Sequence, residues 1–229
     1  MIDTLKIISL DQQKQYRIIP SVFPAINFFE EFVDNAAEME TLIEIESLTN
    51  PRIRQEVGEI FLVPVEDRVK GPGSSVVMAS FTHIYRPSRF SDGSYGVYYA
   101  GLTLETAIKE TVFYRENFLR ATHELAGEIT MRVYEGTIVK PLHDIRYPLF
   151  QSLHDPDNYT QSQQFGKKLK EEKSWGVIYH SVRHPGNHCI AAFRPPTISI
   201  PQQTSHLKYY WNGKKISAVY DVKSVMGFN

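Results

Sequence analysis

Residues 89–100 read RFSDGSYGVYYA, and residues 103–118 read TLETAIKETVFYRENF. The first segment holds an arginine, a turn-forming run with two glycines, and a short aromatic run typical of a strand. In the second segment, Thr103 can cap a helix, and Glu105 is favourable beside the positive end of the helix dipole. Together they predict a loop, a strand that carries Tyr98 and Tyr99, and a helix.

Glu110 occupies an unusual position on that expected helix. At about 100° per residue, Glu105, Lys109 and Glu116 fall on the side opposite the inward stripe. Glu110 falls at the border of the stripe, which is formed by Leu104, Ile108, Thr111, Val112, Arg115 and Leu119. A carboxylate there is partly desolvated, which costs free energy unless it is hydrogen-bonded or paired. Two interpretations follow: a structural salt bridge with an arginine, or a catalytic carboxylate.

The loop before the strand offers a second candidate group. The planar fork of Arg89 matches carboxylate or phosphate oxygens, and Gly93 and Gly96 leave the backbone accessible to a ligand. The alternative is an ordinary surface loop with a solvated arginine. Tyr98 and Tyr99 point to opposite faces of a strand, so only one of them can line a given pocket and the other packs in the core.

The rest of the chain predicts an α+β domain. A helix is expected over 35–48, early in the chain, and strands are expected late, with Asn212-Gly213 suited to a hairpin turn. Helices early and strands late argue against alternating βαβ units. We expect one domain over 1–229, with an N-terminal part of about 80 residues that includes a helical extension, and a catalytic core over 81–229. The expected strands are 176–179, 188–193, 198–200, 207–211 and 216–220.

Composition narrows the class of protein. The 229 residues are 42% hydrophobic with a net charge of -1, which favours a globular fold and argues against a general nucleic-acid binder. The single cysteine, Cys189, excludes an internal disulfide and a multi-cysteine metal site, and favours the cytoplasm. Because no run of 18 apolar residues and no signal peptide is present, we expect neither a membrane span nor export.

Three further patterns suggest other chemistry. The loop Lys70–Ser75 has two glycines but lacks the Gly-Lys-Ser/Thr ending of a P-loop. Ser181 with nearby histidines suggests a hydrolase, yet no Gly-x-Ser-x-Gly elbow surrounds it. His180, His184 and His188 have the spacing of zinc ligands on a helix, but Pro185-Gly186 breaks such a helix, so no metal is expected.

The chain resembles the RES family, named for recurring Arg, Glu and Ser positions. Matching segments follow one another in order: YRIIP at 16–20, LTNPR at 48–52, GPG at 71–73, RF at 89–90, VYYA at 97–100, TAIKE at 106–110 and GVIYHSVR at 176–183. It is similar to the longer branch of that family, which has an N-terminal extension. The resemblance implies a fold like that of the ADP-ribosyltransferase toxins, with a mixed β core and flanking helices.

The resemblance also implies a function. Such proteins are toxins of toxin–antitoxin pairs, neutralised by an Xre-like helix-turn-helix protein, and they consume NAD without a metal. They hydrolyse or phosphorolyse NAD, or transfer ADP-ribose to a protein. A non-catalytic module that binds a nucleotide is the alternative from another class.

Site residues follow from the matched motifs. Glu110, Arg89, Tyr99 and Ser181 correspond to the family's catalytic positions. The residues assigned to substrate binding are Arg17, Arg86, Tyr98 and Arg183. Short members carry a Gly-Gly-Arg-Trp-Asn-like segment where this chain has PSRFS at 87–91, so either Arg89 or Arg86 is expected to meet the pyrophosphate.

Overall fold

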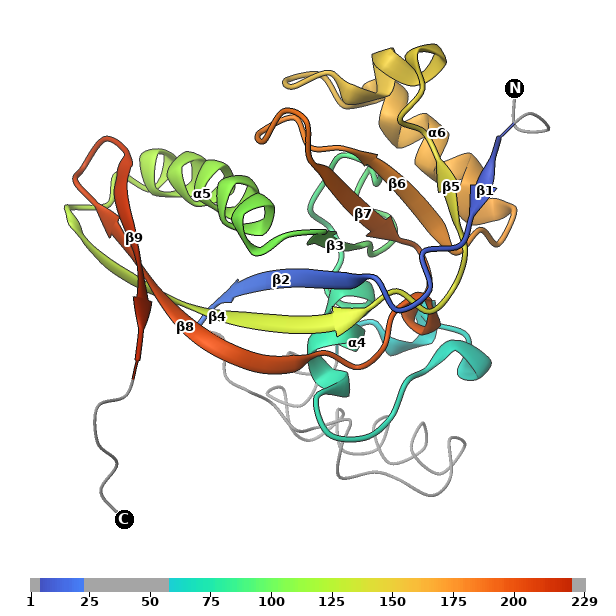
Figure 1. The fold of residues 1–229 in the computed structure, drawn as a ribbon, viewed down its shortest axis with the longest axis horizontal. Helices are drawn as coiled ribbons and strands as arrows, with labels where there is room; N and C mark the ends of the chain where they lie inside the picture. Colours follow the sequence, from blue (N-terminus) through green and yellow to red (C-terminus); the bar gives the residue numbers. More distant parts are fainter. Residues whose placement is uncertain (1–4, 23–57, 224–229) are drawn as a thin grey trace.

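The computed structural model describes residues 5–22 and 58–223, which form a nine-stranded sheet with strand order β1-β5-β6-β7-β3-β2-β4-β8-β9 (Figure 1). β5 and β6 are parallel, and every other pair is antiparallel. The strands are β1 Ile7–Ile8, β2 Lys14–Pro20, β3 Tyr98–Gly101, β4 Gly127–Thr137, β5 Leu142–Asp144, β6 Gly176–His180, β7 His188–Ala192, β8 Gln202–Trp211 and β9 Ile216–Val222.

Helices cover both faces of the sheet (Figure 1). α4 (Ser74–Thr82) lies on one face, and α5 (Leu104–Ala121) and α6 (Thr160–Glu171) lie on the other. Short 3-10 helices, η1 Ile60–Leu62, η2 Val65–Asp67, η3 Pro148–His154 and η4 Pro195–Thr197, connect these elements. This mixed sheet with flanking helices confirms the predicted α+β class. The helix expected over 35–48 and the LTNPR motif lie outside the described residues.

The two faces have separate apolar cores because successive strand residues point to opposite sides. On the α4 face, Val77 and Phe81 pack with Tyr98 of β3 and with Ile178 and Ile190 of β6 and β7. The opposite face has two cores, one under α6 and one under α5. The first includes Leu169, Val177, Ala191 and Phe193, and the second includes Ile18, Ala107, Met131 and Val133.

Most of the expected strands are confirmed. Segments 176–179 and 188–193 correspond to β6 and β7, and 207–211 and 216–220 lie in the β8–β9 hairpin, where Gly213 has a φ of 88°. The strand expected over 198–200 is wrong, because Ile198 makes only an isolated bridge to Ile138. The prolines that open η4 and Pro201, which has no N–H to donate, bound this segment on both sides.

Two further observations concern the loop before α4 and the character of the helices. Gly73, with a φ of 87°, directly precedes α4, so the loop expected over Lys70–Ser75 ends at Gly73, and Ser74 and Ser75 begin a helix that packs against the sheet. Within 5–22 and 58–223, no helix combines the length and the apolar character needed to cross a membrane.

Candidate active site

Helix α5 places Glu110 at the edge of its buried face, as its phase predicts. The Thr103 side chain caps the helix by accepting a hydrogen bond from the Thr106 N–H at 3.2 Å. On the solvent side, Lys109 and Glu105 form an exposed ion pair at 2.9 Å. Glu110 itself is half-buried.

The Glu110 carboxylate is held through one oxygen. The Ser181 hydroxyl donates to Oε1 at 2.6 Å, and the Cys189 thiol lies 3.8 Å from the same oxygen. Burial raises the pKa of the Cys189 thiol, and the Glu110 charge adds to this effect, so Cys189 stays protonated as a donor. Oε2 accepts no hydrogen bond from any residue within 5–22 or 58–223. Glu110 therefore has one fixed oxygen and one that can meet a ligand.

The turn between β6 and β7 orients Ser181. Its N–H donates to the Asn187 carbonyl at 2.8 Å, and its hydroxyl oxygen accepts from the His184 N–H at 2.9 Å. The hydroxyl proton is therefore directed to Glu110. The His184 ring instead bonds Thr106 through Nδ1 at 3.0 Å, so no Ser–His pair of the hydrolase type forms.

Tyr99 ties strand β3 to the segment that contains Arg89. Its hydroxyl accepts from the Phe90 N–H at 2.9 Å and bonds the Ser88 hydroxyl at 2.8 Å. Burial raises the pKa of Tyr99 to about 12, so the phenol is neutral near pH 7. The half-buried ring is thus fixed at its outer end.

Arg89 is 4% exposed and is anchored through one nitrogen. Nη1 donates to the carbonyls of Leu153 at 3.2 Å and Asp155 at 2.8 Å, and the guanidinium lies 4.5 Å from the Tyr159 ring centroid. In the described part of the chain, Nε and Nη2 have no hydrogen-bond partner. These two nitrogens form one edge of the guanidinium fork, the edge that binds an oxyanion through two parallel bonds.

Arg17 and Tyr98 lie on the other face of the sheet. The pairing of Tyr16 with Gly101 puts Arg17 on the side opposite Tyr99 and Gly101. The Arg17 guanidinium lies 4.5 Å from the Tyr98 ring and donates to the Tyr99 carbonyl at 3.0 Å. Tyr98 is fully buried against α4 and donates to Gln15 at 3.1 Å. The structure thus brings together Glu110, Ser181, Tyr99 and Arg89, and keeps these two residues apart from them.

The family model of the RES domain matches residues 66–212, a range that contains all of these groups except Arg17. The chain belongs to the RES domain family. It is 31% identical over 207 residues to the uncharacterised protein y4oC of Sinorhizobium fredii (strain NBRC 101917 / NGR234), which covers 90% of this chain and 86% of that protein. A chain in the crystal structure of the M. tuberculosis MbcT–MbcA toxin–antitoxin complex aligns over 90% of this chain and 87% of its own length, with 12% identity and a TM-score of 0.46. That likeness is too distant to transfer residue roles.

Two further residues predicted from the sequence, Arg86 and Arg183, lie at the periphery of the candidate site. Arg86 is exposed, and its charge, together with the larger effect of burial, lowers the pKa of Arg115 on α5. Arg183 donates to the Pro156 carbonyl at 2.6 Å and lies 3.4 Å from the Phe113 ring centroid. Arg183 therefore holds the segment after η3 against α5. Arg86 keeps its side chain available for an anion.

Tyr114 and Tyr159 lie in the candidate site but were not predicted from the sequence. Tyr114 follows Glu110 by one helical turn, and burial raises the pKa of its phenol, with a smaller contribution from nearby Tyr159, the residue that precedes α6. The i, i+4 spacing from Glu110 could have indicated Tyr114. No local pattern could have indicated Tyr159, because its contact with Arg89 joins segments 70 residues apart in the sequence.

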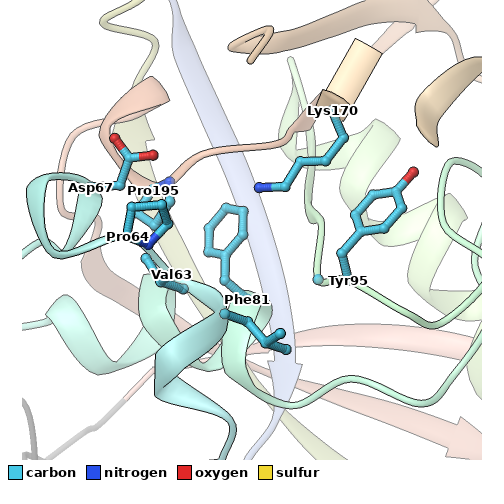
Figure 2. Close-up of a pocket in the computed structure, with 9 residues that line it drawn as sticks. Val63, Pro64, Asp67, Phe81, Tyr95, Lys170 and Pro195 are labelled. Carbon is cyan, nitrogen blue, oxygen red and sulfur yellow. The ribbon is translucent and has the colours of Figure 1, made fainter. Parts of the chain in front are cut away.

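Two other places in the RES fold do not offer a comparable site. The His180 and His188 rings lie with centroids 5.1 Å apart and planes inclined by 55°, but in the described ranges no group of three potential metal ligands converges. Figure 2 shows a small cavity with Lys170 and Tyr95 near one end and Asp67 and Pro64 near the other. Its volume of about 10 Å³ admits a single water molecule, not a nucleotide.

Proposed function

We propose that this protein cleaves the bond between nicotinamide and ribose in NAD, by hydrolysis or phosphorolysis, and acts as a toxin that depletes cellular NAD. One observation carries the proposal: the half-buried Glu110 carboxylate has Oε1 fixed by Ser181 and leaves Oε2 without a partner among the described residues. The matched RES motifs support the same reaction. Because its proposed substrate is cellular NAD, we also propose that the enzyme acts in the cytoplasm.

The chemistry requires a negative charge near the sugar. When the glycosidic C–N bond breaks, its electron pair goes to the pyridinium nitrogen, and the ribose develops oxocarbenium character. Glu110, ionised, would stabilise that positive charge, and partial burial would strengthen the interaction by lowering the local dielectric. Ser181 is a positioning residue, because it holds the carboxylate in one orientation.

The phosphates would be bound at the other end of the site. The Nε–Nη2 edge of Arg89 is suited to bidentate contact with the pyrophosphate, and Arg86 is the accessible second cation. Anchoring of Nη1 supports this role, because the fork loses little conformational freedom when a ligand binds. No metal is needed for these steps.

The decisive experiment is NAD turnover by the wild type, Glu110→Gln and a matched control, Glu116→Gln. Glu116 lies on the same helix but bonds Arg120 and the Ile216 N–H. Loss of the Glu110 charge is expected to reduce turnover about 10²–10³-fold, in the range of an essential electrostatic contact, while Glu116→Gln stays near wild type. Equal consumption by wild type and Glu110→Gln contradicts the proposal. So does the absence of turnover with water, phosphate and a protein acceptor all supplied.

The molecule that accepts the ADP-ribose unit distinguishes hydrolysis, phosphorolysis and transfer to a protein. A rate that rises with added phosphate identifies phosphorolysis. Radiolabel transferred from NAD to a protein in lysate identifies an ADP-ribosyltransferase, whereas free ADP-ribose identifies hydrolysis. Calorimetric binding of NAD without turnover identifies a non-catalytic nucleotide-binding module.

We also propose a protein partner, an Xre-like helix-turn-helix antitoxin. Family membership supports this partner. Expression of the chain should arrest growth, and co-expression of a helix-turn-helix protein from the adjacent reading frame should relieve the arrest. Growth arrest that Glu110→Gln causes equally would contradict a toxic activity at this site.

A further inference from the structure

One histidine, His154, lies between the two residues whose carbonyls anchor Arg89. Nη1 of Arg89 donates to the Leu153 carbonyl at 3.2 Å and to the Asp155 carbonyl at 2.8 Å. His154 separates these two residues in the chain and is the last residue of η3. A displacement of His154 therefore moves both carbonyls that fix the Arg89 guanidinium.

The His154 ring joins η3 to the end of β6. Its Nδ1–H donates to the Phe150 carbonyl at 3.0 Å, and its Nε2 accepts from the N–H of His180, the last residue of β6, at 3.2 Å. A proton on one ring nitrogen and a lone pair on the other define a neutral imidazole in a single tautomer. The neutral ring thus ties the segment that anchors Arg89 to the sheet.

Protonation of His154 would break this tie. The residue is only 7% exposed, so a proton added at Nε2 would face the His180 N–H with little water available to either group. Two opposed donors in a buried place lose their hydrogen bond and are not compensated by solvent. The ring would have to move away from β6, and the Leu153 and Asp155 carbonyls would move with it.

The groups that face His154 from other elements disfavour a charge on its ring. Burial lowers the pKa of His154, the hydrogen bond to the Phe150 carbonyl acts in the opposite sense, and the nearby His180 and Arg89 lower the pKa further. Tyr179 of β6, whose ring centroid lies 6.4 Å from that of His154, is a neutral phenol because burial raises its pKa.

The nearby carboxylates have other partners. Asp155 is exposed, and its carboxylate accepts two backbone N–H groups of its own loop. Asp144, at the end of β5, pairs with Arg146 at 2.7 Å. α6 contacts η3 through the apolar ring of Phe165. Within 5–22 and 58–223, His154 forms no ion pair, so a proton on its ring would add an uncompensated charge beside the arginine.

We propose that His154 is a positioning residue for the pyrophosphate: its neutral ring holds the carbonyls that orient Arg89, and protonation of the ring releases them. This inference rests on the proposed function and adds a pH control to the same site. By linkage, a ligand that needs the anchored arginine expels the proton from His154. A simple Coulomb effect has the opposite sign, because a charged His154 that stayed in place would attract the phosphates.

Binding of ADP-ribose tests the inference without turnover, because this molecule carries the pyrophosphate but no nicotinamide. Its pyrophosphate stays fully ionised over the range of the test. Calorimetric affinity of the wild type should fall about 3–30-fold between about pH 7.5 and about pH 5, less than the loss expected when the charged hydrogen bonds of Arg89 are removed. An affinity that stays constant or rises toward low pH overturns the inference. So does the absence of binding at about 10 mM ligand and about pH 7.5.

Proton release provides a second readout on the wild-type protein. Calorimetry near about pH 6, in two buffers with different ionisation enthalpies, should show that binding of ADP-ribose releases a fraction of a proton. Proton uptake would identify the Coulomb effect instead and overturns the inference.

Variants assign the pH dependence to His154. His154→Gln has no titrating proton, so its affinity for ADP-ribose should lie within about 10-fold of wild type at about pH 7.5 and should lose most of its pH dependence. The exposed control His123→Asn should keep the wild-type profile. Arg89→Lys should weaken binding and flatten the profile, because His154 acts through the arginine fork. A full pH dependence in either His154→Gln or Arg89→Lys overturns the inference. Thermal melts at both pH values confirm that each variant is folded.

The outcomes distinguish this inference from the proposed function. NAD turnover together with pH-independent binding of ADP-ribose rejects the role of His154 alone. Binding of ADP-ribose that depends on pH through His154, without NAD turnover under any acceptor, rejects the proposed reaction alone.

Discussion

The two faces of the sheet use the same residue types in different ways. On the α4 face, Arg17 stacks on Tyr98, and the Tyr98 hydroxyl is bonded inside the core. On the opposite face, Arg89 stacks on Tyr159, but Nε and Nη2 of this arginine have no partner within the described residues. An arginine–tyrosine stack is therefore not in itself a site. Arg17 also has a nitrogen without a partner in 5–22 or 58–223, Nε, but that atom is buried. The second face differs because it also carries the Glu110 carboxylate, which forms no ion pair with a described residue.

The largest effect is expected from Tyr98→Ala, which removes a fully buried ring from the α4 face. The free energy of unfolding should fall by about 3–5 kcal/mol, as for other buried aromatic truncations. Tyr99→Ala should cost less, because that ring is only half-buried. Chemical denaturation measures both. A larger loss for Tyr99→Ala would show that the faces do not divide into packing and binding as described.

The two arginines provide the next comparison. Arg89→Lys removes the bidentate edge, and the KM for NAD should rise about 10–100-fold, the equivalent of 1.5–3 kcal/mol for a charged hydrogen bond. Arg17→Lys should leave KM unchanged and lower only the stability. Steady-state kinetics with parallel melts separates the two effects. A rise in KM for Arg17→Lys would instead place Arg17 in the substrate site.

A histidine behind the site gives the stability a pH dependence. His154 donates from Nδ1 to the Phe150 carbonyl at 3.0 Å, and its Nε2 accepts from the His180 N–H at 3.2 Å. Only a neutral imidazole ring can donate from one nitrogen and accept at the other. Burial lowers the pKa of His154 below its ordinary value of 6.5, and the neighbouring His180 and Arg89 add to this effect.

The unfolded chain therefore binds a proton that the folded protein excludes, so His154 contributes stability above about pH 6.5 that is lost as the pH falls. His154→Gln should lower the free energy of unfolding at pH 7 by about 1–3 kcal/mol, because it disturbs two buried hydrogen bonds. It should also reduce the slope of stability between pH 7 and pH 5. Denaturation across that range, with exposed His123→Asn as the control, measures both effects. An unchanged slope in His154→Gln would contradict the assignment.

The smallest effects are expected at the start of α5, which carries Glu110. Thr103→Ala removes the cap and should cost about 1 kcal/mol of unfolding free energy. Lys109→Ala breaks an exposed ion pair and should change it by less than about 0.5 kcal/mol. Thermal denaturation ranks the two variants. The reverse order would show that the cap does not stabilise the helix start.

Local patterns predicted the elements whose structure depends on near neighbours. The capping residue and apolar spacing of α5 lie within one segment, as do the Asn212-Gly213 turn and the short aromatic strand β3. Strand β4 was not predicted. Its sequence, GEITMRVYEGT, places Glu128, Arg132 and Glu135 among apolar residues. It is a strand because β2 and β8 pair with it on both sides.

The sequence by itself determined that Glu110 lies at the border of the buried helix face, because helical phase depends only on spacing. The tertiary structure decided which groups meet that carboxylate. Ser181 is 71 residues away in the chain and lies 2.6 Å from it. Arg17 matches a family motif yet lies on the other face, because the side on which a strand residue points depends on register, and register depends on the partner strand.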